Sequence, residues 1–243
     1  MNRLLLLFII FSACTSKSAK TVDTIDPEIV LINIEEGDRS FIGRTLLTID
    51  SCKPKLIGID AWFIQEKDST QDIALINALK NIKNVILGYT LDTFGQPLKS
   101  HLKFRTHVPD EGLAIVQNED GLSSHFTPIT LIDDKENEHI ALKIVRKWRP
   151  DFPVDIDKGK TIPINFTRTL DQFVHLNASE LTVAKNLKDI NNKIILLGFL
   201  GPSNEDKHFT PLREKLNIKN NEPDTYGVVI IANEIRTILD YKK

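Results

Sequence analysis

The chain has few cysteines and no excess of positive charge. Its 243 residues include 2 Cys, and the formal net charge is -2. Two cysteines form one disulfide at most, which excludes a disulfide-rich fold. Binding to phosphate backbones depends on clustered Lys and Arg, and the sequence has no such cluster, so nucleic acid is not an expected partner.

Motifs of the common enzyme classes are also missing. There is no Gly-x-Ser-x-Gly elbow, no His-Glu-x-x-His, no Walker loop and no glycine-rich dinucleotide fingerprint. Asp206 and His208 would suit metal ligation or acid and base chemistry, but such pairs also stabilise loops. We therefore expect a protein that is not an enzyme and needs no metal or cofactor. The remaining histidines are expected at the surface: His101, His107, His125, His139 and His175.

No apolar run in the sequence is long enough to span a membrane. Leu4 to Phe11 is less than half of the roughly 20 residues needed, and with Arg3 before it and Ala13 after it the pattern is typical of a signal peptide over residues 1–13. The triplet before Cys14 resembles a bacterial lipobox, whose cysteine is acylated, for example with palmitate. An ordinary secretory signal with a chance cysteine is the alternative. A polar tether over residues 14–26 would then precede a domain over residues 27–243.

Strand and helix patterns alternate along the chain. Continuous apolar runs predict buried strands over residues 29–34, 56–59, 85–89 and 193–199. Helical spacing predicts helices over residues 38–51, 138–148 and 227–239. A further helix is predicted to begin at Thr70, with Ile73 facing inward. This order predicts an α/β fold in a single domain, with a mostly parallel central sheet and helices on both faces.

The middle of the chain is less regular. Residues 113–117 and 126–132 are predicted strands, and Pro163 places a short strand over 161–166 at a sheet edge. Residues 207–224 form the longest polar loop and are the expected flexible element.

Several segments together resemble the second CHASE family, the CHASE type 2 domains, which are extracytoplasmic sensory domains of bacterial signalling proteins. The resemblance covers residues 27–241 in order and spacing, and no single motif carries it. The segments are Ile29-Val30-Leu31-Ile32-Asn33-Ile34, Pro54 to Phe63, Asn84 to Tyr89, Ile164-Asn165-Phe166, Lys193 to Gly201, Thr210-Pro211, Tyr226-Gly227-Val228 and Ala232-Asn233.

The resemblance implies sensing. Family members usually carry transmembrane helices and an output domain after this domain, whereas this sequence ends at Lys243. We therefore expect a free-standing, lipid-anchored sensory or ligand-binding module in the bacterial cell envelope, exported and held at the membrane. It would bind an unknown small-molecule ligand and act through a partner such as a membrane signalling protein.

The strand exits carry the candidate ligand-binding residues. Ligands of open parallel sheets bind where loops leave the carboxyl ends of the strands. Those loops carry Glu35, Asp60 with Trp62, Tyr89 and Asp206. Helix or turn capping is the alternative role for Glu35 and for Asp60.

Two function classes stay open from the sequence. A cleft lined by Asp60, Trp62, Tyr89 and Asp206 would favour a ligand-binding sensor. A flat apolar patch on the outer face of the last helix would favour a structural or assembly subunit of an envelope complex.

Overall fold

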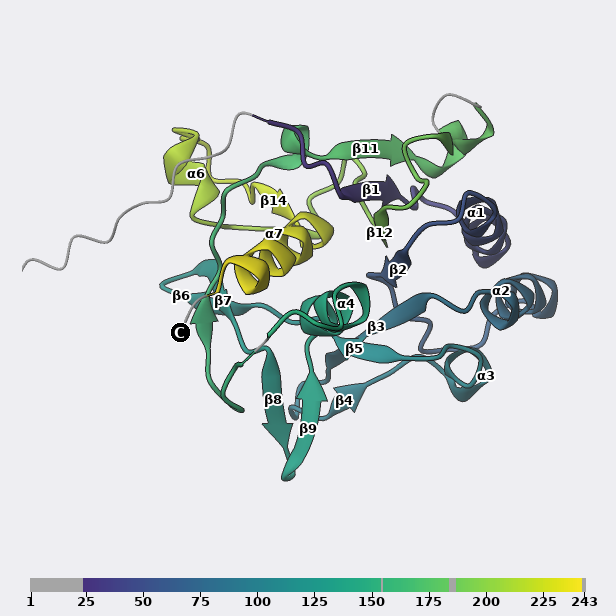
Figure 1. Ribbon diagram of the computed structural model, residues 1–243, viewed down its shortest axis with the longest axis horizontal. Helices are drawn as coiled ribbons and strands as arrows, with labels where there is room; N and C mark the ends of the chain where they lie inside the picture. Colours follow the sequence, from purple (N-terminus) through teal and green to yellow (C-terminus); the bar gives the residue numbers. More distant parts are fainter. Residues whose placement is uncertain (1–23, 154, 184–186, 242–243) are drawn as a thin grey trace, which may run out of the picture.

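A seven-stranded sheet runs through the computed structural model, which describes residues 24–153, 155–183 and 187–241 (Figure 1). Its strands in spatial order are β11 (Val174–Asn177), β1 (Ile29–Asn33), β12 (Ile194–Gly198), β2 (Leu56–Ile59), β3 (Val85–Leu91) and β4 (Pro97–Leu98), and β5 (Glu111–Leu113) also pairs with β3. Only the pairing of β3 with β4 is antiparallel. The predicted α/β fold with a mostly parallel sheet is confirmed.

Helices cover both faces of the sheet, as predicted (Figure 1). One face packs against α1 (Arg39–Ser51) and α2 (Ser69–Asn81), beside which lies the short α3 (Leu102–Arg105). The other face packs against α4 (Ile140–Trp148) and α7 (Gly227–Asp240). Strands β1, β2 and β12 bury every residue, which explains their continuous apolar sequence.

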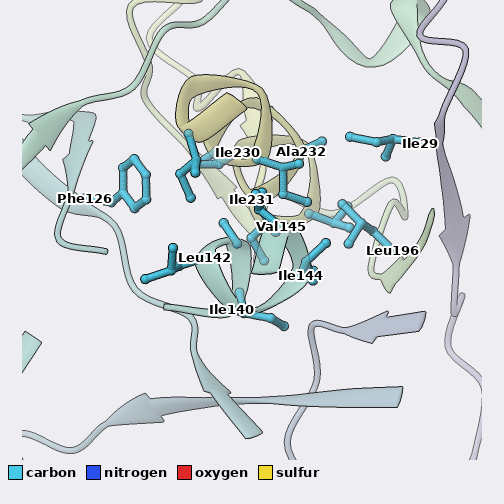
Figure 2. Close-up of a cluster of buried hydrophobic side chains, with 14 of the residues drawn as sticks. Ile29, Phe126, Ile140, Leu142, Ile144, Val145, Leu196, Ile230, Ile231 and Ala232 are labelled. Atoms are coloured by element: carbon cyan, nitrogen blue, oxygen red, sulfur yellow. The ribbon is translucent and has the colours of Figure 1, made fainter. Parts of the chain in front are cut away.

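Helices α4 and α7 pack against each other and against the same face of the sheet. Figure 2 shows Ile144 and Val145 of α4 facing Ile231 of α7, with Leu196 of β12 beside them. The start of α4 lies directly on β5, because a Cβ atom on Gly112 would lie only 2.6 Å from the Ile140 Cα atom. Glycine is therefore required there for the close approach.

Smaller elements surround this framework. One small sheet has three strands in the order β10 (Ile162–Pro163), β7 (Leu122–Phe126) and β6 (Gln117–Glu119). Strand β8 (Ile129–Ile132) pairs with β9 (Lys135–Glu138) in an antiparallel hairpin. Strand β13 (Lys207–His208) pairs in the same antiparallel way with β14 (Thr225–Tyr226). The described residues also contain the short helices α6 (Leu212–Lys215), η1 (Leu170–Gln172) and η2 (Ala178–Thr182), of which η1 and η2 are 3-10 helices. Pro163 lies in an edge strand, as predicted.

The middle of the chain differs from the predictions. The predicted strand over 113–117 is divided between β5 and β6, and the one over 126–132 is divided between β7 and β8. The segment 207–224 is not one loop, since it contains β13 and α6. The prediction that Ile73 faces inward is wrong, because Ile73 is 56% exposed. Its neighbour Asp72 is buried instead and pairs with Arg39 of α1 at 2.5 Å.

The predicted signal peptide and the possibility of a membrane-spanning helix both concern attachment to a membrane. The predicted signal peptide and Cys14 lie outside the described residues, so the boundaries at residues 13 and 26 stay predictions. Within residues 24–153, 155–183 and 187–241, no helix has the length and apolar character needed to cross a membrane.

Candidate functional site

A cavity of about 350 Å³ lies where the loops leaving β2, β3 and β5 meet the start of α7. Asp60 and Trp62 follow β2, Thr90 lies near the end of β3, and the segment 114–116 follows β5. Asp206 reaches the same cavity from the loop after β12. The sequence-predicted residues Asp60, Trp62 and Asp206 are therefore brought together at the carboxyl ends of parallel strands, where α/β folds bind ligands.

Asp60 and Asp206 both lie close to Gly227, the first residue of α7. A Cβ atom placed on Gly227 would lie 3.2 Å from Oδ2 of Asp60 and 3.3 and 3.4 Å from the two carboxylate oxygens of Asp206. The backbone of Asp60 is fixed by its N–H, which donates to the Leu197 carbonyl at 2.8 Å. The Gly227 N–H fixes Asp206 in the same way, donating to its backbone carbonyl at 2.9 Å.

Both aspartates hold their protons more tightly than ordinary carboxyl groups. Burial within the cavity walls raises the pKa of Asp60 to about 7, and the charge of Asp206 adds to the rise, although Asp60 keeps some accessible surface. Burial also raises the pKa of Asp206 to about 6, while the Gly227 N–H opposes that rise. Both pKa values therefore lie near neutral pH, where a bound cation can shift the two carboxyl groups from the protonated to the ionised form.

Glu234 of α7 is a third acid in the cavity. Its side chain is 1% exposed, and its Oε2 atom has no hydrogen-bond partner. Burial, and then the charge of Asp60, keep the pKa of Glu234 well above its ordinary value. An unpartnered buried carboxyl oxygen costs about 1–3 kcal/mol, so its presence in a cavity calls for an explanation.

His139 closes the inner side of the cavity and corrects a prediction, because it is buried and not at the surface. It is the N-cap of α4: its Nδ1 accepts from the Ala141 N–H at 3.3 Å, and its Nε2 donates to the Ile115 carbonyl at 2.9 Å. Burial lowers the pKa of His139 to about 4, while the bond to Ile115 opposes the fall. The imidazole is therefore neutral and offers no charge to Glu234.

The rim of the cavity is polar and aromatic. Trp62 is 38% exposed and lines the cavity from its solvent side. His208 also lines the cavity, burial lowers its pKa, and its Nδ1 lies 3.3 Å from the Ser123 hydroxyl. Glu205 is exposed at the same edge. The inner wall is apolar and includes Ile230 and Ile231, which Figure 2 shows on α7.

Two candidate residues lie outside the cavity. Tyr89 lies within β3, which extends two residues beyond it, and its hydroxyl donates to Oδ1 of Asn137 at 2.8 Å. Glu35 turns toward β11 and η2, where its Oε2 accepts from the Ser179 N–H at 2.9 Å. Its contact is therefore of the capping kind that the sequence left open.

Metal ligation was one possibility for the pair Asp206 and His208. In the part of the chain that the structure describes, no group of three or more His, Cys, Asp and Glu side chains is arranged to hold a metal ion.

Sequence reasoning missed His139, Gly227 and Glu234 as parts of the site. The pair Asn233 and Glu234 was the available signal, because these two polar residues interrupt the apolar and fully buried stretch 228–235 of α7. Nothing in the sequence around His139 separates a buried N-cap from a surface histidine.

Comparisons with known proteins place the chain in a family. Neither the curated proteins nor the solved structures contain a match to it. The family model described as the CHASE2 domain matches residues 18–243, which is nearly the whole chain. The predicted resemblance is thereby confirmed, and the chain belongs to the CHASE2 domain family of extracytoplasmic sensory domains.

Proposed function

We propose that this chain is an extracytoplasmic sensor that binds a small ligand in the cavity between Asp60, Asp206 and Glu234. The observation that carries the proposal is the unpartnered Oε2 atom of the buried Glu234. Proteins seldom keep such a group unless a ligand or water satisfies it. A pocket of about 350 Å³ is at the small end of ligand sites, which span roughly 300–1,000 Å³.

The alternative of a structural or assembly subunit receives less support. The sequence analysis tied that alternative to an apolar patch on the outer face of the last helix. In α7, however, residues 228–235 are all buried, and the residues with more accessible surface toward its end include Arg236 and Asp240. The last helix therefore offers no wide apolar face for a partner.

Binding, and not catalysis, is the role we assign to the cavity. A general base needs a free lone pair within reach of a substrate. Both ring nitrogens of His139 are engaged, one by the Ala141 N–H and the other by the Ile115 carbonyl. We therefore assign no general-base role to His139, and we propose that the acids recognise a ligand.

The proposal also includes an anchor and a partner. Acylation of Cys14 would hold the domain at the membrane, as the lipobox-like triplet before it suggests. The elements of the described residues form one α/β domain, so the signal has to be delivered to something outside these residues. A membrane signalling protein is the kind of partner that the family's sensory role favours.

A thermal-shift screen with cavity-filling variants tests the binding function. Val116 lines the cavity, whereas Val183 is 52% exposed on the surface, so Val116→Trp fills the site and Val183→Trp is its matched control. Compounds that bind the folded site should raise the melting temperature of the wild type and of Val183→Trp but not of Val116→Trp. Thr90→Phe gives a second filled cavity if Val116→Trp folds poorly. Equal shifts in all variants would refute the proposal.

A further inference from the structure

The cavity carries several acids without a basic counterpart. Asp60, Asp206 and Glu234 lie in its walls and Glu205 at its edge, and among the described lining residues there is no Lys or Arg. Its two histidines, His139 and His208, both have lowered pKa values because they are buried. Once the pH exceeds the raised pKa values of these acids, the walls therefore carry negative charge that no side chain of the site neutralises.

Two buried aspartates outside the cavity are paired with basic side chains, unlike the acids of the cavity. Buried Asp72 contacts Arg39 and Lys103, and buried Asp26 contacts Arg168 and Arg236. Buried charges in proteins are normally paired in this way. The cavity acids depart from the pattern, and Glu234 keeps an oxygen with no hydrogen-bond partner at all.

The geometry points to a small organic cation as the ligand of this cavity, with its ammonium group between Asp60 and Asp206 beside Gly227 and within reach of the Glu234 charge. This inference rests on the proposed function and names its ligand class. Oxygens of both aspartates approach the backbone at Gly227, because a Cβ atom there would lie only 3.2 to 3.4 Å from three of them, so the two carboxylates lie close to one another at the start of α7. Closely spaced carboxylates attract an ammonium group whether or not it carries N–H donors, and N–H donors add charge-assisted hydrogen bonds.

The remaining walls suit the body of such a cation better than they suit a bare ion. Ile230, Ile231 and Val116 offer apolar contact, and Trp62 offers an aromatic face at the solvent side. Tryptophan is the best of the aromatic partners for ammonium groups. A metal ion would need three or more converging ligands, and the described residues contain no such set.

Calorimetric titration of the purified full chain at pH 8 with matched probes tests the inference. Choline and phenethylamine carry the charge, and dimethylbutanol and phenylethanol are their uncharged isosteres. At least one cation should bind about tenfold or more tightly than its isostere, which corresponds to about 1.4 kcal/mol. Magnesium, calcium and zinc ions are titrated in parallel to test the metal alternative.

Variants show whether the acids are responsible. Glu234→Gln and Asp60→Asn keep side-chain shape and should each weaken cation binding about tenfold or more, while Asp240→Asn, an exposed acid of the same helix, should leave it unchanged. Circular dichroism establishes that each variant folds. Binding of cations that survives in both acid variants overturns the inference.

Other outcomes separate this inference from the proposed function. Equal binding of cations and isosteres, or no binding of either cation, overturns the cation assignment, and so does tight binding of a metal ion alone. The proposed function stands in those cases if any compound stabilises the wild type but not Val116→Trp. Binding that persists in Val116→Trp places the ligand outside the cavity and overturns both.

Discussion

Glu234 and His139 face each other inside the cavity, with Oε2 of the carboxyl group 3.6 Å from Nδ1 of the ring, and they do not form an ion pair. The Nδ1 atom already accepts from the Ala141 N–H, and burial lowers the pKa of His139 to about 4. At 3.6 Å the two atoms are also too far apart for a hydrogen bond. The contact therefore leaves Glu234 unsatisfied and available to a ligand.

The first prediction follows from the cost of burying Glu234. Its pKa is raised in the folded state, so the folded protein holds this proton more tightly than the unfolded chain does. Because the unfolded chain gives up this proton first, the free energy of unfolding falls as the pH rises above the ordinary value of 4.5. Glu234→Gln removes that penalty and should stabilise the ligand-free protein more at pH 8 than at pH 5.

Urea unfolding at both pH values measures this effect. Glu214→Gln is the control, because Glu214 is exposed and its replacement should change stability little. A loss of stability in Glu234→Gln at pH 8 would mean that the carboxylate makes a stabilising contact in the folded protein.

The second prediction concerns the pH dependence of ligand affinity. Choline keeps its charge at every pH, so any change in its affinity between pH 5 and pH 8 reflects the protein. The pKa values of Asp206 and Asp60 are about 6 and about 7, so both ionise in this range and choline affinity should rise with pH. Glu234 works in the same direction, and Glu205, His139 and His208 are the other titratable groups that line the cavity.

The aspartate variants identify the groups responsible. Asp60→Asn should flatten the upper part of the profile, toward pH 7, and Asp206→Asn the lower part, toward pH 6. Titration calorimetry at about four or more pH values between 5 and 8 separates the contributions of the two aspartates to the affinity. A wild-type profile without slope would remove these carboxylates from the site.

The third prediction concerns the junction between the first residues of the domain and its last helix. Asp26 is buried and accepts from the Arg236 guanidinium of α7, with Nε at 2.7 Å, and it also contacts Arg168 at 3.1 Å. Removing one member of a buried charge cluster leaves the others uncompensated. Asp26→Asn should therefore lower the free energy of unfolding by about 3–5 kcal/mol in urea denaturation.

A surface acid provides the comparison for this loss. Asp151 is exposed, and Asp151→Asn should change stability by about 0.5 kcal/mol or less. If Asp26→Asn is as stable as Asp151→Asn, the junction does not hold the last helix in place.

The fourth prediction concerns the anchor. If Cys14 is acylated, the wild-type protein should sediment with membranes and incorporate labelled fatty acid, whereas Cys14→Ala should be soluble or remain unprocessed. Cys52→Ala controls for the loss of a thiol, since Cys52 lies at the end of α1 with its Sγ atom 3.3 Å from the Thr48 carbonyl. Unlipidated wild-type protein in the soluble fraction would contradict the prediction.

The fold could be predicted largely because its central strands are buried on both faces. Runs such as Ile29–Asn33 and Ile194–Gly198 have no polar alternation, and Asp38 marks the start of α1 with a cap, its Oδ1 atom accepting from the Phe41 N–H at 2.7 Å. Strand β11 escaped prediction because Val174–Asn177 alternates between partly buried and exposed residues at a sheet edge. Short edge strands of this kind resemble loops in sequence.

The candidate site could be predicted only in part. Asp60 and Asp206 follow from the rule that ligands bind at strand exits. Tyr89 was misplaced because β3 extends to Leu91, so that it is Thr90, on the opposite side of the strand, that lines the cavity. Glu234 comes from a helix packed against the sheet, and its position depends on long-range packing that a local pattern does not contain.

The last prediction concerns Gly227, which lets three carboxylate oxygens of the two aspartates approach the backbone at the start of α7. A Cβ atom there would lie 3.2 to 3.4 Å from three of their carboxylate oxygens, which is tighter than an ordinary contact, so the carboxylates would have to move by a few tenths of an ångström. Because Gly227 is the first residue of α7 and its N–H donates to the Asp206 carbonyl, alanine keeps that bond and suits the helix. Gly227→Ala should therefore leave the unfolding free energy within about 1 kcal/mol of the wild type while weakening choline binding about tenfold or more.

A second glycine distinguishes this local effect from a general one. Gly95 has a φ of 78° and nothing within 4 Å of a Cβ atom, and it does not line the cavity, so Gly95→Ala strains the backbone without filling the cavity. It should cost some stability and leave choline affinity unchanged, the reverse of the result for Gly227→Ala. Calorimetry and urea unfolding on both variants give the comparison. If Gly227→Ala binds choline as the wild type does, the ammonium does not lie between Asp60 and Asp206.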